Sequence, residues 1–283
     1  MFVTGGTGYI GSALVAQLIA AGHEVSALVR SDASAAAVEA AGATSVRGEL
    51  TDAATVTAAA AAADAAIHTA ATNDADGPAA DLAVAKAILA GLGGKPYVHT
   101  SGVWVYGDTD GVATEDSPLA PPAITAWRPG NEHEVVETPG AHAVFVIPGL
   151  VWGGGQGQGL VPLFSKTDDD TPRFLDDGSG HWSLVHVDDI AALYVLALEA
   201  PHGSRFIGVA DVLTQRDVAE AVAKATGSTA EPRSWPLAEA QAAFGALADA
   251  MALDQVATGA RARRELGWQP EHADARAGLT AGA

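Results

Sequence analysis

Short runs of β-branched and aromatic residues alternate with longer stretches rich in alanine and leucine through the first half of the chain. The apolar runs predict strands, each bounded by turn residues, at Phe2–Thr4, Glu24–Val29, Ala43–Arg47, Ala65–Thr69, Tyr97–Thr100 and Val144–Ile147. The stretches between them predict helices, including Ile10–Ala21 and one from about Pro78 to Leu92. Because parallel strands need crossover connections, this order predicts a doubly wound α/β fold with a mostly parallel sheet.

The pattern changes after Pro148, where glycines gather, and past Asp211 the chain reads as mainly helical. We therefore expect residues 1–152 and 183–211 to form the doubly wound domain. Residues 153–182 and 212–283 are expected to form a smaller, helix-rich part that binds the substrate. A ligand of such a fold lies beyond the carboxyl ends of the strands, in the crevice between the two parts.

Composition narrows the classes of partner. With 48% apolar and 17% charged residues, the chain can bury a sizeable core. Its net charge of −19 repels phosphate backbones and anionic membrane surfaces, so no nucleic-acid or membrane partner is expected. The absence of cysteine excludes disulfides, thiol nucleophiles and Cys-ligated metals. No basic segment precedes an apolar run at the start, which favours a cytoplasmic protein.

The segment Thr4–Gly11 reads Thr-Gly-Gly-Thr-Gly-Tyr-Ile-Gly and lies between the first predicted strand and the first predicted helix. Glycine at these spacings permits a tight turn and close backbone approach, while the helix N-terminus presents N–H groups to a pyrophosphate. The sequence thus predicts a dinucleotide site in the doubly wound domain. Its expected contacts here are Gly5, Thr7, Gly8, Tyr9, Ile10 and Gly11.

The end of the second predicted strand indicates which dinucleotide binds. An acidic residue there would bind the ribose 2′-hydroxyl of NAD, but this strand is followed by Arg30 and Ser31. Arginine suits a 2′-phosphate, so the sequence favours NADP(H), with NAD(H) kept as the alternative. The alternative is that Arg30 is a merely solvated arginine, and the nearby Asp32 adds weight to it.

The chain resembles the extended and atypical short-chain dehydrogenase/reductases, specifically the NAD-dependent epimerase/dehydratase family. Besides the glycine turn, the segments that carry the resemblance are Gly48–Asp52, Ile67–Ala71, Val105–Gly107, Pro148–Gly153, Val185–Asp189 and Gly267–Pro270. They extend over nearly the whole chain. The resemblance implies a Rossmann fold and further cofactor contacts at Glu49, Leu50, Ala70, Ala71, Asn131, Pro148 and Leu150.

The catalytic positions depart from this family. Its members use a Ser or Thr, a Tyr and a Lys four residues after the Tyr, and the corresponding positions here are Gly102, Trp127 and Asn131. The usual Tyr–Lys mechanism is therefore absent. Hydride transfer would still need a donor for the developing oxyanion, and Ser101 and Tyr106 are the candidates. Asn131 is the candidate ribose ligand; Arg128, His133 and bulk water are alternative proton donors.

The substrate pocket is expected to be aromatic and apolar, lined by Trp104, Trp127, Leu150, Trp152 and Trp182. Such a pocket disfavours a dianionic nucleotide sugar, because buried phosphate needs paired charge. We therefore expect a small, largely apolar carbonyl, enone or imine-like substrate. No metal site is expected: His181, His186, Asp188 and Asp189 are more simply core and helix-cap residues.

Three hypotheses for function follow. The first is an NADP(H)-dependent oxidoreductase with a non-standard proton donor. The second is a dinucleotide-binding protein that has lost catalysis and reports redox state through a partner, and the third is a nucleotide-sugar epimerase or dehydratase. Relatives in the resembled family pair through the helices after the fourth and fifth strands, so a homodimer is an open alternative.

Overall fold

The computed structural model describes residues 1–72, 74–154, 159 and 171–282. By its internal contacts the chain divides into two compact units. Unit 1 comprises Met1–Ser101, Trp127–Val146 and Ala191–Phe206, and unit 2 comprises Gly102–Ala126, Ile147–Ile190 and Ile207–Ala283. These bounds differ from the sequence-based ones, since 102–126, 147–152, 183–190 and 207–211 belong to unit 2. Part of the predicted 153–182 segment lies outside the described residues.

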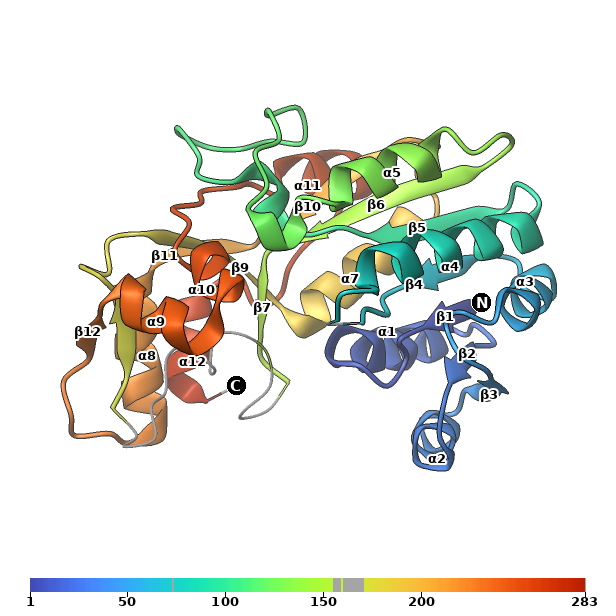
Figure 1. Ribbon diagram of the computed structural model, residues 1–283. Coiled ribbons are helices and arrows are strands. Elements are labelled where there is room, and N and C mark those ends of the chain that lie inside the picture. Colours follow the sequence, from blue (N-terminus) through green and yellow to red (C-terminus); the bar gives the residue numbers. More distant parts are fainter. Residues whose placement is uncertain (73, 155–158, 160–170, 283) are drawn as a thin grey trace. The chain divides into compact units, whose positions relative to one another are not determined.

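A seven-stranded sheet has the order β10-β6-β5-β4-β1-β2-β3 (Figure 1). The strands from β3 to β6 in this order pair in parallel, as the alternation of strands and helices predicts. The fold is therefore the doubly wound, Rossmann-like α/β fold expected from the sequence. The strands are β1 (Phe2–Thr4), β2 (Ser26–Val29), β3 (Thr44–Arg47), β4 (Ala66–His68), β5 (Pro96–Thr100), β6 (His142–Pro148) and β10 (Arg205–Gly208).

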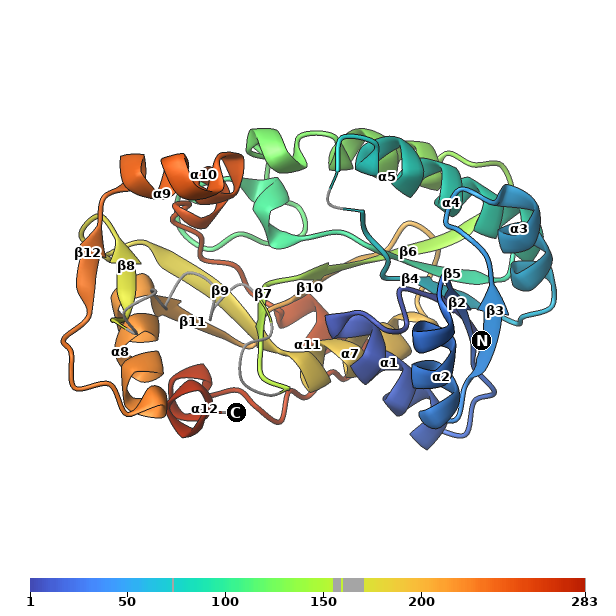
Figure 2. The same ribbon diagram turned by 60° about the horizontal axis from the view of Figure 1, so that its bottom comes forward.

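Helices cover both faces of this sheet in unit 1. Helices α3, α4 and α5 lie on one face, and α1 and α2 lie on the other (Figure 2). Their bounds are α1 (Tyr9–Ala20), α2 (Asp32–Ala40), α3 (Ala53–Ala61), α4 (Gly77–Leu92) and α5 (Arg128–Val136). Helix α5 forms although Pro129 and Gly130 stand in its first turn, where proline has no intrahelical hydrogen bond to lose.

The core of unit 1 under α3 and α4 is built from aliphatic and aromatic side chains of β1, β4, β5 and β6. Phe2, Ile88, Tyr97 and Phe145 are fully buried in this cluster. Small alanines on α3 and α4 allow the two helices to approach closely, and the added Cβ of an alanine at Gly91 would lie 2.3 Å from the carbonyl oxygen of Thr57. This packing places the first turns of α4 beside the end of β4, where the candidate site lies.

Unit 2 holds two smaller sheets, of order β11-β9-β7 and β12-β8. Strand β9 pairs with β11 on one side and with β7 on the other, which explains why 183–186 belong to unit 2 rather than to the Rossmann unit. The remaining elements are the 3₁₀ turns η1 (Val103–Tyr106) and η2 (Ala123–Thr125), strands β7 (Leu150–Trp152), β8 (Arg173–Leu175), β9 (His181–His186), β11 (Asp211–Thr214) and β12 (Arg233–Trp235), and helices α7 (Val187–Ala197), which continues into unit 1, α8 (Gln215–Thr226), α9 (Leu237–Phe244), α10 (Ala246–Met251), α11 (Ala260–Leu266) and α12 (Ala275–Ala281). Among the described helices, none combines the length and the apolar character that crossing a lipid bilayer requires.

Candidate functional site

The glycine-rich turn connects β1 to α1 within unit 1. The N–H of Gly8 donates to the carbonyl oxygen of Gly5 at 2.8 Å, and this bond closes the turn. Gly8 is the N-cap of α1 and offers no side chain to the first turn of the helix. The first backbone N–H groups of the helix can therefore donate hydrogen bonds to a bound anion. Thr7 and Gly8 of the turn are exposed.

Close backbone packing explains why glycines occupy this turn. Gly5 has a φ of +77°, and a Cβ there would lie 2.6 Å from the backbone nitrogen of Ala70. A Cβ on Gly11 would lie 2.0 Å from the carbonyl oxygen of Gly5. At Gly8 the corresponding distance to that oxygen is 3.1 Å. The cradle is thus free of side chains at three positions, which is what close approach of a pyrophosphate requires.

Arg30 follows β2 and is exposed at the edge where the ribose of a dinucleotide would lie. Its sequence neighbour Asp32 pairs with Arg47 of β3 instead. In the described part of the chain no acidic group pairs with Arg30. Ser31 caps α2 by accepting from the N–H of Ser34 at 3.1 Å, so α2 has a formed N-terminus next to Arg30.

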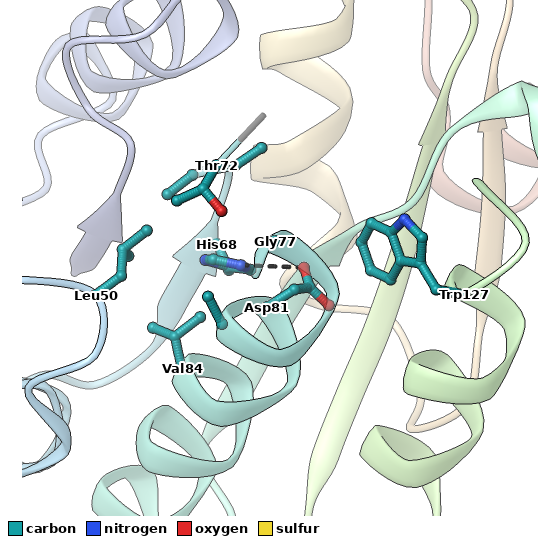
Figure 3. Close-up of a pocket in the computed structure, with 10 residues that line it drawn as sticks. Leu50, His68, Thr72, Gly77, Asp81, Val84 and Trp127 are labelled. Carbon is teal, nitrogen blue, oxygen red and sulfur yellow. Dashed lines mark ion pairs between the residues drawn. The ribbon is translucent and has the colours of Figure 1, made fainter. Parts of the chain in front are cut away.

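A small cavity of about 20 Å³ lies beside β4 and the first turns of α4 (Figure 3). Three residues of the predicted cofactor set, Leu50, Ala70 and Ala71, line it together with Trp127. This volume is close to that of one water molecule. The cavity is therefore no substrate pocket by itself, although it brings these predicted contacts together in unit 1. Glu49 is exposed next to Leu50.

Asn131 stands where the resembled family has lysine, on the first turns of α5. Its Nδ2 donates to the carbonyl oxygen of Pro78 at 2.8 Å and to Asp81 Oδ2 at 2.9 Å. Both amide hydrogens are therefore used within unit 1. The Oδ1 atom is the part of Asn131 that a ribose hydroxyl could still bind, by donating to it.

Ser101 directly follows β5 and is buried, with 3% of its surface exposed. Its N–H donates to the carbonyl oxygen of Val146, but its Oγ has no hydrogen-bond partner among the described residues. A buried hydroxyl without a partner retains its full donor capacity. The neighbouring Thr100 is engaged instead: its Oγ1 lies 2.7 Å from the Tyr194 hydroxyl, and its carbonyl oxygen accepts from Arg128 at 3.1 Å.

The other predicted residues belong to unit 2. Tyr106 and Pro148 are buried there. Trp152 and Trp182 are only 1% and 5% exposed and pack with Leu150 in one apolar cluster, with Trp104 partly buried against it. Trp182 Nε1 donates to the carbonyl oxygen of Met251 at 2.9 Å. Tyr106 belongs to a different apolar cluster. The roles of all these residues toward substrate and cofactor stay predictions.

Three polar side chains that the sequence did not group together meet at the cavity: His68 on β4, Asp81 on α4 and His99 on β5. One signal was present, because His68 and His99 are each the last residue but one of a predicted strand. The contribution of Asp81 depends on how α4 covers the sheet, which residue spacing does not reveal.

Comparison with known proteins places this geometry in context. The model of the NAD dependent epimerase/dehydratase family matches residues 1–207. An uncharacterized protein of Schizosaccharomyces pombe is 32% identical, over 96% of this chain and 95% of its own length. The solved structure of a dTDP-glucose 4,6-dehydratase from Streptomyces venezuelae, with NAD bound, is 26% identical with a TM-score of 0.79, covering 99% of this chain and 94% of that one. A UDP-glucose 4-epimerase from Thermus thermophilus, in complex with NAD, shares the fold at 22% identity and a TM-score of 0.79, covering 99% of this chain and 96% of that one.

Proposed function

Because the chain belongs to the NAD dependent epimerase/dehydratase family, we propose that it is an NADP(H)-dependent oxidoreductase that acts on a small, largely apolar carbonyl or imine-like substrate. The observation that carries the proposal is the glycine turn. Its three side-chain-free positions and the uncapped N-terminus of α1 fit a pyrophosphate group. Gly5, Thr7, Gly8, Tyr9, Ile10 and Gly11 would hold the dinucleotide there.

Arg30 supports the choice of NADP(H) over NAD(H). Its guanidinium is exposed after β2, and the acidic residue nearest in sequence, Asp32, is already paired with Arg47. An arginine without an acidic partner can bind a 2′-phosphate through charge-assisted hydrogen bonds. A carboxylate at this place, which would bind a 2′-hydroxyl and repel a phosphate, is missing from the sequence.

When bound, the dinucleotide supplies or accepts a hydride. The chain's own residues must orient the substrate and stabilise the charge that develops on its oxygen. Ser101 is the donor we assign to that oxygen, because its Oγ is buried and without a partner among the described residues. Asn131 Oδ1 would accept from a ribose hydroxyl, while its Nδ2 is held by Pro78 and Asp81.

The substrate class follows from what replaces the family's Tyr and Lys. Trp127 and Asn131 bring neither an acidic hydroxyl nor a positive charge to those positions. Trp104 is the tryptophan of unit 2 that stays partly exposed, while Trp152 and Trp182 are buried in the apolar cluster, and a nucleotide diphosphate would need paired cations. This argument favours a small apolar carbonyl over the sugar nucleotides named for the two solved enzymes.

The test is a titration of the purified protein with NADPH and, separately, with NADH, followed by nicotinamide fluorescence. Charge-assisted hydrogen bonds contribute about 1.5–3 kcal/mol, so Arg30→Ala should weaken NADPH binding by about 10- to 100-fold. NADH binding should change little. Lys86→Ala is the matched control, because it removes one positive charge from the exposed surface of α4. If Arg30→Ala weakened the binding of NADPH and of NADH by the same factor, the NADP(H) assignment would be overturned.

Turnover is tested with the same protein. A panel of apolar aldehydes, ketones and enones is screened for oxidation of NADPH, and Ser101→Ala is compared with the wild type on any substrate found. Ser101→Ala should lower kcat with little change in NADPH affinity. Tight NADPH binding without turnover on any carbonyl would instead support the hypothesis of a dinucleotide-binding protein that has lost catalysis.

A further inference from the structure

Two histidines and an aspartate meet inside unit 1, on the face of the sheet that α4 covers. His68 and His99 are paired residues of the neighbouring parallel strands β4 and β5, so their side chains lie on the same face. Asp81 reaches both from α4, and Figure 3 shows its contact with His68. Both imidazole side chains are 1% exposed, and the carboxylate side chain is 10% exposed.

The inner atoms of this cluster are spaced too widely for hydrogen bonds. His68 Nε2 lies 3.4 Å from Asp81 Oδ1, and His99 Nε2 lies 3.6 Å from Asp81 Oδ2. An N–H···O hydrogen bond usually measures 2.7–3.2 Å. His68 Nε2 is buried and has no hydrogen-bond partner among the described residues. The two nitrogen atoms therefore face the carboxylate at ion-pair distance.

The outer atoms of the same residues are held by neighbours. His68 Nδ1 lies 2.6 Å from Thr4 Oγ1, and His99 Nδ1 lies 2.7 Å from the Tyr97 hydroxyl. Asn131 Nδ2 donates to Asp81 Oδ2 at 2.9 Å. Hydrogen bonds at the outer atoms fix ring orientation and leave the inner atoms directed at one point. Metal-binding histidines in proteins are oriented by partners of this kind.

The chemistry of the cluster is that of a cation ligand set. Asp81 brings a carboxylate with a 10% exposed side chain next to two imidazoles that are each 1% exposed. Imidazole nitrogen and carboxylate oxygen are both ligands of divalent transition metals. A buried anion needs a counter-charge or a metal ion.

We propose that His68 Nε2, His99 Nε2 and the Asp81 carboxylate bind a divalent transition-metal ion of the zinc class. Zinc bonds of about 2.0–2.1 Å in a tetrahedron separate ligand atoms by about 3.4 Å. The separation of His68 Nε2 from Asp81 Oδ1, 3.4 Å, and that of His99 Nε2 from Asp81 Oδ2, 3.6 Å, are close to this value. One ligand atom from each residue lies within 4.8 Å of the others. Two imidazoles select zinc, cobalt, nickel or copper over magnesium and calcium.

The fourth ligand is a water molecule. His68 and Asp81 both line the cavity of about 20 Å³, whose volume accommodates roughly one water. Trp127 and Thr72 border the same cavity. Three protein ligands plus one water are typical of zinc sites with an open position. Bound in this way, the ion joins α4 to β4 and β5, next to Asn131, which donates to Asp81.

The experiment uses the full chain, stripped with a chelator and dialysed against Co²⁺ and, separately, Zn²⁺. We expect one Co²⁺ per chain with the intense visible absorption of a tetrahedral ion. We also expect a Zn²⁺-dependent rise in Tm that Mg²⁺ does not produce. His68→Gln and His99→Gln should each weaken Co²⁺ binding by more than about 100-fold, since even partners of ligands contribute 10- to 100-fold. Thr4→Val, nearly equal in volume, should weaken it by about 10- to 100-fold.

His272→Gln is the matched control, because His272 belongs to the other His and Asp group, with His186 and Asp188, in unit 2. That variant should bind Co²⁺ like the wild type. Loss of binding in His272→Gln, with binding kept in His99→Gln, would overturn the proposal. If the His68 and His99 variants fail to fold, the wild-type protein decides the question. The proposal is overturned if one equivalent of Co²⁺ gives no visible absorption or only the weak absorption of an octahedral ion. It is also overturned if Zn²⁺ leaves the Tm unchanged.

Discussion

Gly11 and Gly130 provide a paired test of the close packing in the glycine turn. Each is the third residue of its helix, α1 and α5, and alanine is better than glycine in a helix by about 1 kcal/mol. They differ in surroundings. A Cβ on Gly11 would lie 2.0 Å from the carbonyl oxygen of Gly5, whereas a Cβ on Gly130 would meet nothing within 4 Å. The same substitution should therefore have opposite effects at the two positions.

The magnitude follows from these two terms. Overpacking costs about 1–3 kcal/mol, and an overlap with rigid backbone belongs at the upper end. After the gain in helix propensity, Gly11→Ala should lower the free energy of unfolding by about 2 kcal/mol, equivalent to about 4–8 °C in Tm. Gly130→Ala should raise it by about 0.5–1 kcal/mol. Differential scanning calorimetry of both variants without nucleotide measures the difference. Equal stabilisation in both would refute the packing argument, since it would mean that the turn has room for a side chain at position 11.

Two further variants test unit 2. Asp189 is 4% exposed and accepts hydrogen bonds from the N–H groups of Glu271 at 2.7 Å and His272 at 3.0 Å. Asp189→Ala should therefore lower the free energy of unfolding, measured in urea, by about 2–5 kcal/mol, and Asp189→Asn should lower it less. Equal losses in the two variants would contradict the role of Asp189 as a double acceptor. Trp182→Phe removes the buried hydrogen bond to the carbonyl oxygen of Met251 and should lower the free energy of unfolding in urea by about 1–2 kcal/mol. An unchanged urea midpoint would show that this hydrogen bond contributes no net stability.

The sequence predicted those features that depend on residues close together in the chain. The first strand and helix were expected at Phe2–Thr4 and Ile10–Ala21, and the structure has them at Phe2–Thr4 and Tyr9–Ala20. Periodicity and the glycine turn sufficed there. Strands β8 and β12, of three residues each, were not predicted, because so short a run carries no periodic signal. They form through pairing with each other across about 60 residues of chain.

The same limit applies to the candidate site. The cofactor turn lies within eight residues and could be predicted from local spacing. The grouping of His68, Asp81 and His99 requires both the register of β4 against β5 and the rotation of α4 about its axis. Alanine-rich helices such as α4 have weak amphipathic patterns, so which side of such a helix faces the sheet is poorly encoded in the order of residues. Asn131 shows the same difficulty, since its partners Pro78 and Asp81 come from another helix.

Each compact unit is assembled from three separate stretches of the chain. No single cut in the polypeptide can therefore give a fragment that consists of one complete unit and nothing else. A fragment ending at residue 207, where the family match ends, would contain all of unit 1 but also unfinished pieces of unit 2 with exposed apolar surface. Biosynthesis has the same consequence: unit 1 is not completely synthesised until Phe206 has been added, after much of unit 2 has already left the ribosome.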